Sequence, residues 1–313
     1  MARQLERFDN LVALFLARAA EKSDAPFLWA KRAGEWRSVS WSDAARQVAA
    51  LSASLRRIGL QPGDRVALVS ENRPEWLIAD LGIMAAGCIT VPTYTTNTTR
   101  DHTHILGNSG AAAVIVSSNR LAKTLIPAVL TASDCRHIIG IDDVRSGQLP
   151  QNIEDHRWAD LIGAESETDI ASEQALRLKR DDDACIIYTS GTGGAPRGVP
   201  QHHGAILCNL EACTDIISTD FGWGDEVFLS FLPASHAYEH MGGQHFPIAL
   251  GGQIYYAESL EKLASNIEEV KPTIMVVVPR LFEMLRTRIM RSIEASGGLS
   301  KYLLDRALAI GAA

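Results

Sequence analysis

A run of hydroxyl-bearing and glycine residues, closed by a single cation, is the strongest chemical signal in the sequence. It extends from Tyr188 to Val199 and reads Tyr-Thr-Ser-Gly-Thr-Gly-Gly-Ala-Pro-Arg-Gly-Val. Glycines let the backbone approach an anion closely and point N–H groups at it, while Thr and Ser hydroxyls donate to phosphate oxygens. Arg197 adds a fixed positive charge and a planar fork of donors that suits phosphate. The segment therefore predicts a polyphosphate-binding loop and a nucleotide-using enzyme.

Two common nucleotide motifs do not fit this segment. A Walker A motif needs Lys after its last glycine, whereas Gly198 is followed by Val199. The dinucleotide pattern Gly-x-Gly-x-x-Gly fails because its sixth position, counted from Gly191, is Pro196. A plain glycine-rich surface turn remains the bland alternative. The density of hydroxyls and the closing cation favour phosphate binding.

A second set of residues could do different chemistry. His236, Glu239 and His240 match His-x-x-Glu-His, the pattern in which two histidines bind zinc and a glutamate activates water. Such a zinc hydrolase needs a helix through both histidines, and Pro233 together with Gly242 and its neighbour leaves little room for one. It also needs a third ligand, for which position alone suggests Glu261, Glu268 or Glu283. The zinc hydrolase is therefore a remote alternative.

Composition narrows the class of protein. The 313 residues are 46% apolar, and the charge is 30 − 37 = −7 with no long basic run, which disfavours a nucleic-acid partner. The five cysteines are odd in number and contain no Cys-x-x-Cys pair, which favours a reducing, cytoplasmic compartment. The longest apolar window, Leu77 to Val91, contains Asp80 and falls short of the roughly 20 residues of a membrane span. Peripheral contact at the inner membrane face stays open.

Strand and helix patterns alternate along the chain, which predicts an α/β fold of layered, mostly parallel sheets packed with helices. The polar stretch from Ser146 to Asp183 suggests a boundary, so we expect one α/β subdomain over 1–170 and a second over 171–313 that carries the phosphate loop. The strands are predicted at Arg65–Ser70, Cys88–Val91, Ala112–Val116, His137–Ile141, Ala184–Thr189, Glu226–Phe231, Gln253–Tyr256 and Thr273–Val278. The helices are predicted at 42–58, Pro74–Ala86, Leu121–Leu130, His203–Ile217 and Leu260–Val270, from Arg280 onward, and over 301–310.

Four motifs in this order resemble the adenylate-forming superfamily of acyl-CoA synthetases, luciferases and peptide-synthetase adenylation domains. The Tyr188–Val199 loop is similar to its phosphate-binding signature, and Phe231–Glu239 resembles its substrate-side motif in the form typical of long-chain fatty acyl-CoA ligases. Gly82–Pro92 and Lys271–Arg280 resemble the flanking helix–strand and strand elements. Gly193 stands where the family usually has Thr, and Arg197 where it usually has Lys. The resemblance implies the large N-terminal domain of the acyl-CoA synthetase-like fold.

The resemblance also implies an activity, the joining of a fatty acid to CoA through an acyl-adenylate, with ATP, Mg²⁺ and CoA. In that scheme the hydroxyl of Thr189 assists the metal, and His236 is a catalytic residue that lies beside the acyl pocket and the α-phosphate. Arg197 serves both binding and catalysis. The residues Ser190, Gly191, Thr192, Gly194 and Arg197 hold the β- and γ-phosphates, and Thr189 and Gly193 belong to the same cofactor-binding set.

Later family motifs have no counterpart in this sequence: the adenine-side Tyr-Gly-x-Thr-Glu, a ribose-binding Asp and a C-terminal domain with a catalytic Lys. We therefore expect the N-terminal part of a ligase, truncated and unable to complete turnover alone. A non-catalytic ATP- or acyl-binding remnant is the alternative. Acyl chain length and oligomeric state are not set by the sequence.

Overall fold

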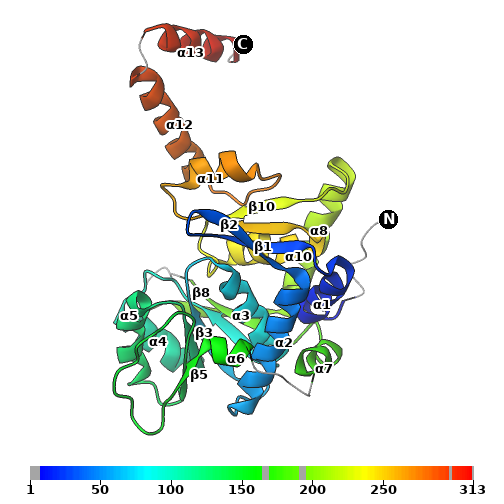
Figure 1. The fold of residues 1–313 in the computed structure, drawn as a ribbon, viewed down its shortest axis with the longest axis vertical. Helices are drawn as coiled ribbons and strands as arrows, with labels where there is room; N and C mark the ends of the chain where they lie inside the picture. The colour runs from blue at the N-terminus through cyan, green and yellow to red at the C-terminus, as the bar shows by residue number, and fades with distance from the viewer. Residues whose placement is uncertain (1–7, 164–168, 190–194, 296–297, 312–313) are drawn as a thin grey trace. The chain divides into compact units, whose positions relative to one another are not determined.

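Two β-sheets organise the first of the two units into which the chain divides, Met1–Met275 and Val276–Ala313. The computed structural model describes residues 8–163, 169–189, 195–295 and 298–311 (Figure 1). Each unit is considered by itself. The sheets and the predicted sites all belong to the first.

The larger sheet has seven strands in the order β7-β6-β5-β3-β4-β8-β9. Every neighbouring pair is parallel except the hairpin of β8 and β9. Successive side chains of a strand point to opposite faces, so Val66 and Leu68 enter one hydrophobic cluster while Ala67 and Val69 enter the other. Both faces of this sheet are therefore covered. The strands are β3 (Arg65–Val69), β4 (Ile89–Pro92), β5 (Ala111–Val116), β6 (His137–Gly140), β7 (Glu154–Arg157), β8 (Asp183–Thr189) and β9 (Arg197–His202).

The smaller sheet joins the two ends of the first unit. Its order is β10-β11-β1-β2, with β1 (Pro26–Arg32) and β2 (Glu35–Ser40) forming an antiparallel hairpin. The strands β10 (Val227–Ser230) and β11 (Gln253–Tyr256) are parallel to β1, with Leu28 in register with Ile254. An N-terminal hairpin thus completes a sheet whose other strands come more than 180 residues later in the sequence, since 227 − 40 = 187.

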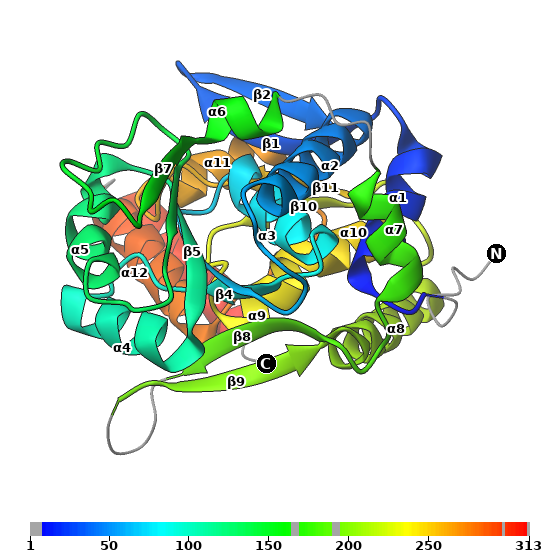
Figure 2. The same cartoon turned by 90° about the horizontal axis from the view of Figure 1, so that it is seen from below.

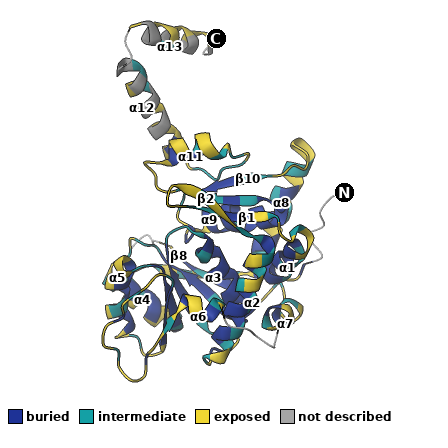
Figure 3. Cartoon of the chain, in the orientation of Figure 1, coloured by how far each residue is buried: buried dark blue, intermediate teal, exposed yellow. Residues whose placement is uncertain are grey.

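Helices form layers on both faces of the larger sheet. Between the sheets lie α2 (Trp41–Arg57), which begins at the capping Ser40, and α3 (Pro74–Ala85), which begins with a proline. Nearly every residue of α3 is buried, as a helix enclosed on all sides requires (Figure 3). On the opposite face lie α4 (Thr99–Ser109) and α5 (Asn119–Val129) (Figure 2).

The remaining helices frame these layers or make up the second unit. Those of the first unit are α1 (Leu11–Lys22), α6 (Trp158–Ile162), α7 (Ile170–Arg177), α8 (His203–Asp220), α9 (Ala237–Glu239), the π-helix η1 (His240–His245), α10 (Phe246–Leu250) and α11 (Leu263–Val270). The second unit contains α12 (Pro279–Ala295) and α13 (Gly298–Gly311). Among the described residues, no helix combines the length and the apolar character that crossing a bilayer would require.

The predicted α/β class is confirmed, with one strand corrected. The expected strand over residues 273–278 does not form, and only an isolated bridge joins Ile274 to Phe228. The side chain of Thr273 explains part of this, because its hydroxyl donates to Glu226 and accepts from the Val227 amide, so a side chain takes the place of strand pairing. The sequence suggested a boundary near residue 170. Each sheet contains strands from before and after this residue, so neither sheet lies on one side of it alone.

Candidate functional site

A polar pocket lies where parallel strands of both sheets end. Its volume is about 230 Å³, and its walls come from the segments that follow β3, β4, β10 and β11. Ligands of open α/β sheets bind outside the carboxyl ends of the strands, where loops can present polar groups. The lining includes Asn72, Thr95, Phe231, Ser235 and Glu258. This is the location at which the fold favours a ligand.

The β8–β9 hairpin brings together the two ends of the predicted phosphate loop. Thr189 is the last residue of β8 and Arg197 the first of β9, and the two are register partners across the hairpin. Both are exposed. The predicted phosphate ligands Ser190, Gly191, Thr192, Gly193 and Gly194 lie outside the described residues. The hairpin therefore places a hydroxyl and a guanidinium at the same end of the sheet.

Helix α4 supports this hairpin through two polar contacts that the sequence did not reveal. His104 Nε2 hydrogen-bonds the carbonyl oxygen of Pro196 at 2.7 Å, and the Tyr188 hydroxyl donates to Asn108 Oδ1 at 2.6 Å. The His104 and Tyr188 rings meet edge to face with centroids 6.3 Å apart. Because α4 and the hairpin are about 80 residues apart in sequence, no local pattern signals these partners.

His236 lies beside the polar pocket, directly after its lining residue Ser235. Its side chain is exposed, and its Nδ1 accepts a hydrogen bond from the Tyr238 amide at 3.2 Å, which caps the short helix α9. The other ring nitrogen, Nε2, belongs to the same exposed side chain, where a ligand could reach it. The predicted role of His236 beside an acyl group and an α-phosphate stays a prediction.

Asn72 fixes the segment that carries His236, and sequence reasoning missed it. Its amide nitrogen donates to the Leu232 carbonyl at 2.6 Å and to Ser230 Oγ at 3.0 Å, and its Oδ1 accepts from the Ala234 amide at 3.0 Å. One side chain thus ties the loop after β10 to the loop after β3. A polar residue just past a predicted strand was the only available signal.

The zinc-hydrolase pattern does not assemble, which corrects that alternative. Glu239 is 1% exposed and accepts from Ser230 Oγ at 2.5 Å, away from the exposed His236. Burial raises the pKa of Glu239 to about 8, against the opposing hydrogen bonds of Ser230 and Gln244. His240 turns into the core, where it meets Asp80. A π-helix follows α9, so the pattern never forms the α-helical turn that zinc proteases use.

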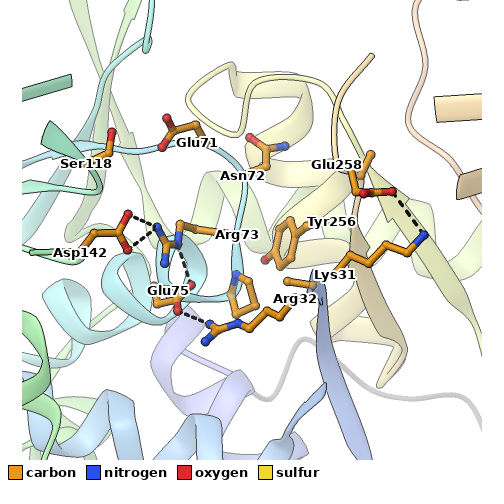
Figure 4. A pocket seen from close by; sticks show the side chains of 13 residues that line it. Lys31, Arg32, Glu71, Asn72, Arg73, Glu75, Ser118, Asp142, Tyr256 and Glu258 are labelled. Carbon is orange, nitrogen blue, oxygen red and sulfur yellow. Dashed lines mark hydrogen bonds and ion pairs between the residues drawn. The ribbon is translucent and has the colours of Figure 1, made fainter. Parts of the chain in front are cut away.

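A second pocket of about 360 Å³ adjoins the first and shares Asn72 and Glu258 with it. Figure 4 shows that charged side chains pair with one another across it. Arg73 binds both Glu75 and Asp142, at 2.8 and 3.1 Å. Burial raises the pKa of Glu75, but its bonds to Arg73 and the nearby Arg32 outweigh burial and hold that pKa below its usual value. These ion pairs offset one another's charges along the wall of the second pocket.

Comparison with known proteins decides the family. The model of the family described as "AMP-binding enzyme" matches residues 15–312. The chain belongs to this family. Membership confirms the resemblance drawn from the Tyr188–Val199 loop and the motifs around it.

Relatives of this AMP-binding enzyme include ligases of long-chain fatty acids. Long chain acyl-CoA synthetase 1 of Arabidopsis thaliana is 27% identical over 315 residues, which cover 97% of this chain and 45% of that protein. The chloroplastic long-chain-fatty-acid–[acyl-carrier-protein] ligase AEE15 of the same plant is 26% identical over 275 residues, covering 85% of this chain and 37% of that protein. The chain thus spans less than half the length of these two relatives.

A solved structure shows the same fold. The adenylation domain of a carboxylate reductase from Mycobacterium chelonae superimposes with a TM-score of 0.76 at 19% identity, over 92% of this chain and 49% of that one. At this identity the likeness speaks for the fold alone. It agrees with the large N-terminal domain that the sequence predicted.

Proposed function

We propose that this chain carries the ATP- and carboxylate-binding part of an ATP-dependent fatty acyl ligase. The observation that carries the proposal is the β8–β9 hairpin, whose register sets Thr189 opposite Arg197 at the end of the sheet where the polar pocket opens. The family supports the reaction class, and the relatives' names support a long-chain fatty acid as the substrate. A cytoplasmic location, with peripheral contact at a membrane face, belongs to the same proposal on sequence grounds.

In the first proposed step, a carboxylate oxygen of the fatty acid attacks the α-phosphorus of ATP. The bond from that phosphorus to the oxygen bridging to the β-phosphate breaks, and pyrophosphate leaves. Both reactants are anions, so the step needs positive charge that is fixed before reaction. Arg197 supplies it to the departing phosphates, together with the hydroxyl and amide groups of the loop.

Mg²⁺ fits the donor chemistry at the end of β8, because hydroxyl and phosphate oxygens are the hard ligands that this ion prefers. Thr189 is exposed there and would hold it. When bound, the ion offsets phosphate charge and helps orient the attack. His236 would shape the acyl side of the site and donate a hydrogen bond to the α-phosphate.

In the second proposed step, a thiol attacks the acyl carbon of the adenylate and AMP leaves. We assign this thiol to CoA, as the name of Arabidopsis synthetase 1 suggests. The name of the second relative contains an acyl-carrier protein instead. Offering the complete gene product CoA and an acyl-carrier protein in parallel distinguishes the two acceptors, because only the correct thiol consumes the adenylate.

The adenylation step is tested by pyrophosphate exchange into ATP, measured in the complete gene product with a panel of carboxylic acids. Removing one preorganised donor from a developing charge costs roughly 10²–10³ in rate. We expect a loss of that order for Arg197→Ala and a smaller loss for Thr189→Ala. Arg197→Lys, which keeps the charge, should retain more activity than Arg197→Ala.

Arg46→Ala serves as the matched control, because Arg46 is an exposed cation that pairs with Asp43 within α2. Its exchange rate should equal that of the unaltered protein. Unchanged exchange in both Thr189→Ala and Arg197→Ala would contradict the assignment of the site.

A further inference from the structure

Three buried side chains from distant parts of the sequence converge in the core of the first unit. Asp80 lies on α3, and His240 and His245 are the first and last residues of η1. Nε2 of His240 is 3.0 Å from Asp80 Oδ2, and Nε2 of His245 is 3.1 Å from the same oxygen. All three side chains are at most 1% exposed. We call these residues the Asp80 cluster.

The π-helix is what aims both imidazoles at one oxygen. In an α-helix, residues three or four apart share a face, so residues five apart diverge. A π-helix bonds residue i to i+5 and so brings residues five apart to the same side. The two rings accordingly lie with centroids 4.7 Å apart and planes at 76°. π-turns are rare and occur frequently at functional sites.

The donor set of the Asp80 cluster matches a metal site. Two imidazole nitrogens and a carboxylate are zinc ligands, and bonds of 2.0–2.1 Å in a tetrahedron put ligand atoms about 3.3 Å apart. The separations of the two imidazole nitrogens from Asp80 Oδ2, 3.0 and 3.1 Å, are close to that spacing. All three ligand atoms lie within 4.8 Å of one another.

Asp80 also has an unused oxygen. Its Oδ1 is buried and has no hydrogen-bond partner among the described residues. Hydrogen bonds from the two histidines alone leave this oxygen unpaired, and an unpaired buried carboxylate oxygen destabilises the folded state. A cation bound by both carboxylate oxygens of Asp80 and by Nε2 of both histidines would leave none of these four atoms without a partner.

We propose that Asp80, His240 and His245 hold a structural divalent metal ion, zinc by the chemistry of its ligands. Imidazole ligands favour zinc over magnesium or calcium, which prefer all-oxygen sites. The complete burial of the cluster leaves no open position for a substrate, so the ion binds as the chain folds and has a structural role. It would join α3 to η1, which follows α9 and its capping residue His236 in the chain.

A second group of possible metal ligands lies at the edge of the larger sheet and would compete with the Asp80 cluster for zinc, so the experiment must remove it. His137 Nδ1 lies 3.1 Å from His156 Nε2, and Glu154 Oε2 lies 3.8 and 3.7 Å from these two atoms. Glu154 is well exposed, so this group can take up metal from the buffer after folding. Replacing both histidines, His137→Ala with His156→Ala, removes this group and leaves the Asp80 cluster as the one such group among the described residues.

The experiment uses the complete gene product in this background, without a polyhistidine tag, refolded with one equivalent of zinc. We expect one zinc per chain by mass spectrometry after desalting, and a higher Tm than in a sample refolded with a chelator. In His245→Gln the amide can still donate to Asp80, but the imidazole ligand is gone. This variant should lose the zinc, and its Tm should no longer depend on zinc.

A cobalt measurement keeps the proposal testable if His245→Gln does not fold. Refolding the background protein with Co²⁺ should give the visible absorption of a four-coordinate site. A background protein that retains no zinc and whose Tm does not respond to it overturns the proposal and leaves a purely hydrogen-bonded cluster. Full zinc retention by folded His245→Gln overturns it as well.

Discussion

Single side chains connect segments of the first unit that the sequence keeps far apart. Asn10 caps α1 through the Ala13 amide and also donates to the carbonyls of Ala175 and Leu178 at 3.0 Å. Arg18, only 3% exposed, donates to the Ala249 carbonyl at 3.2 Å. Buried polar groups of this kind stabilise the fold only while their partners stay in place. The stability of this unit therefore depends on a few polar residues as well as on its apolar core.

Buried histidines make the stability depend on pH. His102 on α4 is 2% exposed, and burial lowers its pKa to about 4 from 6.5, against a small opposing effect of Asp101. The unfolded chain therefore binds a proton at this residue more readily than the folded one between these two values. The free energy of unfolding should fall as the pH drops from 6.5 to 4, by about 3 kcal/mol for this residue.

Urea unfolding at several pH values checks this, with His102→Gln as the test variant. The variant should lose less stability than the unaltered protein over the same range. Equal slopes in the unaltered protein and His102→Gln would refute the prediction.

At the scale of elements, Asn72 holds the loop after β10 in place. We expect Asn72→Ala to slow pyrophosphate exchange by roughly 10–100-fold, because small displacements of a positioned group cost rates of this order. Hydrogen exchange at the Ala234 amide should become faster. Asn72→Asp keeps an acceptor for that amide but loses both donated bonds, so we expect an intermediate effect.

Asn119 gives a matched control with the same chemistry elsewhere. Its amide nitrogen donates to the Asp143 carbonyl and its Oδ1 accepts from the Arg145 amide, both at 2.7 Å. Asn119→Ala therefore frees a comparable loop away from the polar pocket. It should leave pyrophosphate exchange unchanged, and a similar loss of activity in both variants would argue against a positioning role for Asn72.

The π-helix η1 contains a glycine, Gly243, at a position with no room for a side chain. A Cβ added at Gly243 would clash with Glu239 Oε1, so the buried carboxyl would have to leave its bond to Ser230. We expect Gly243→Ala to lower the free energy of unfolding by about 2 kcal/mol or more. A Cβ added at Gly107 on α4 would meet no other part of the described structure within 4 Å. Gly107→Ala should therefore be neutral or stabilising by up to about 1 kcal/mol. Equal free energies of unfolding for the two variants in urea would contradict this reading.

The sequence identified elements with strong periodic patterns and missed those formed by long-range pairing. The predicted helix from Pro74 appears as α3, and the strand over Arg65–Ser70 appears as β3 one residue shorter. The hairpin of β1 and β2 is mostly exposed or half-buried, so its side chains do not alternate clearly between apolar and polar. The phosphate loop stays a prediction, which the sequence allows because the chemistry of such a loop is local. The supports at His104, Asn108 and Asn72 could not be predicted, since each acts on a distant segment.

At the scale of the whole molecule, the first unit contains both hydrophobic clusters. Their described members run from Phe8 to Ile274. We therefore expect a chain that ends at residue 275 to unfold in one cooperative urea transition with an unchanged near-UV circular dichroism spectrum. A chain that ends at residue 252 lacks β11 and should lose that transition, because β1 then has no parallel partner. Loss of cooperativity in the longer of the two chains would contradict the division at 275.

The register between β1 and β11 also has a consequence during synthesis. Leu28 pairs with Ile254, and 254 − 28 = 226 residues separate them. At a translation rate of about 5–20 residues per second, one edge of β1 waits roughly 10–45 s for its neighbour. During that interval this edge of β1 exposes unpaired backbone N–H and C=O groups to the solvent, next to the apolar side chains of Phe27 and Leu28. We therefore expect changes that slow elongation of the nascent chain to reduce the yield of folded protein before they alter any property of the finished molecule.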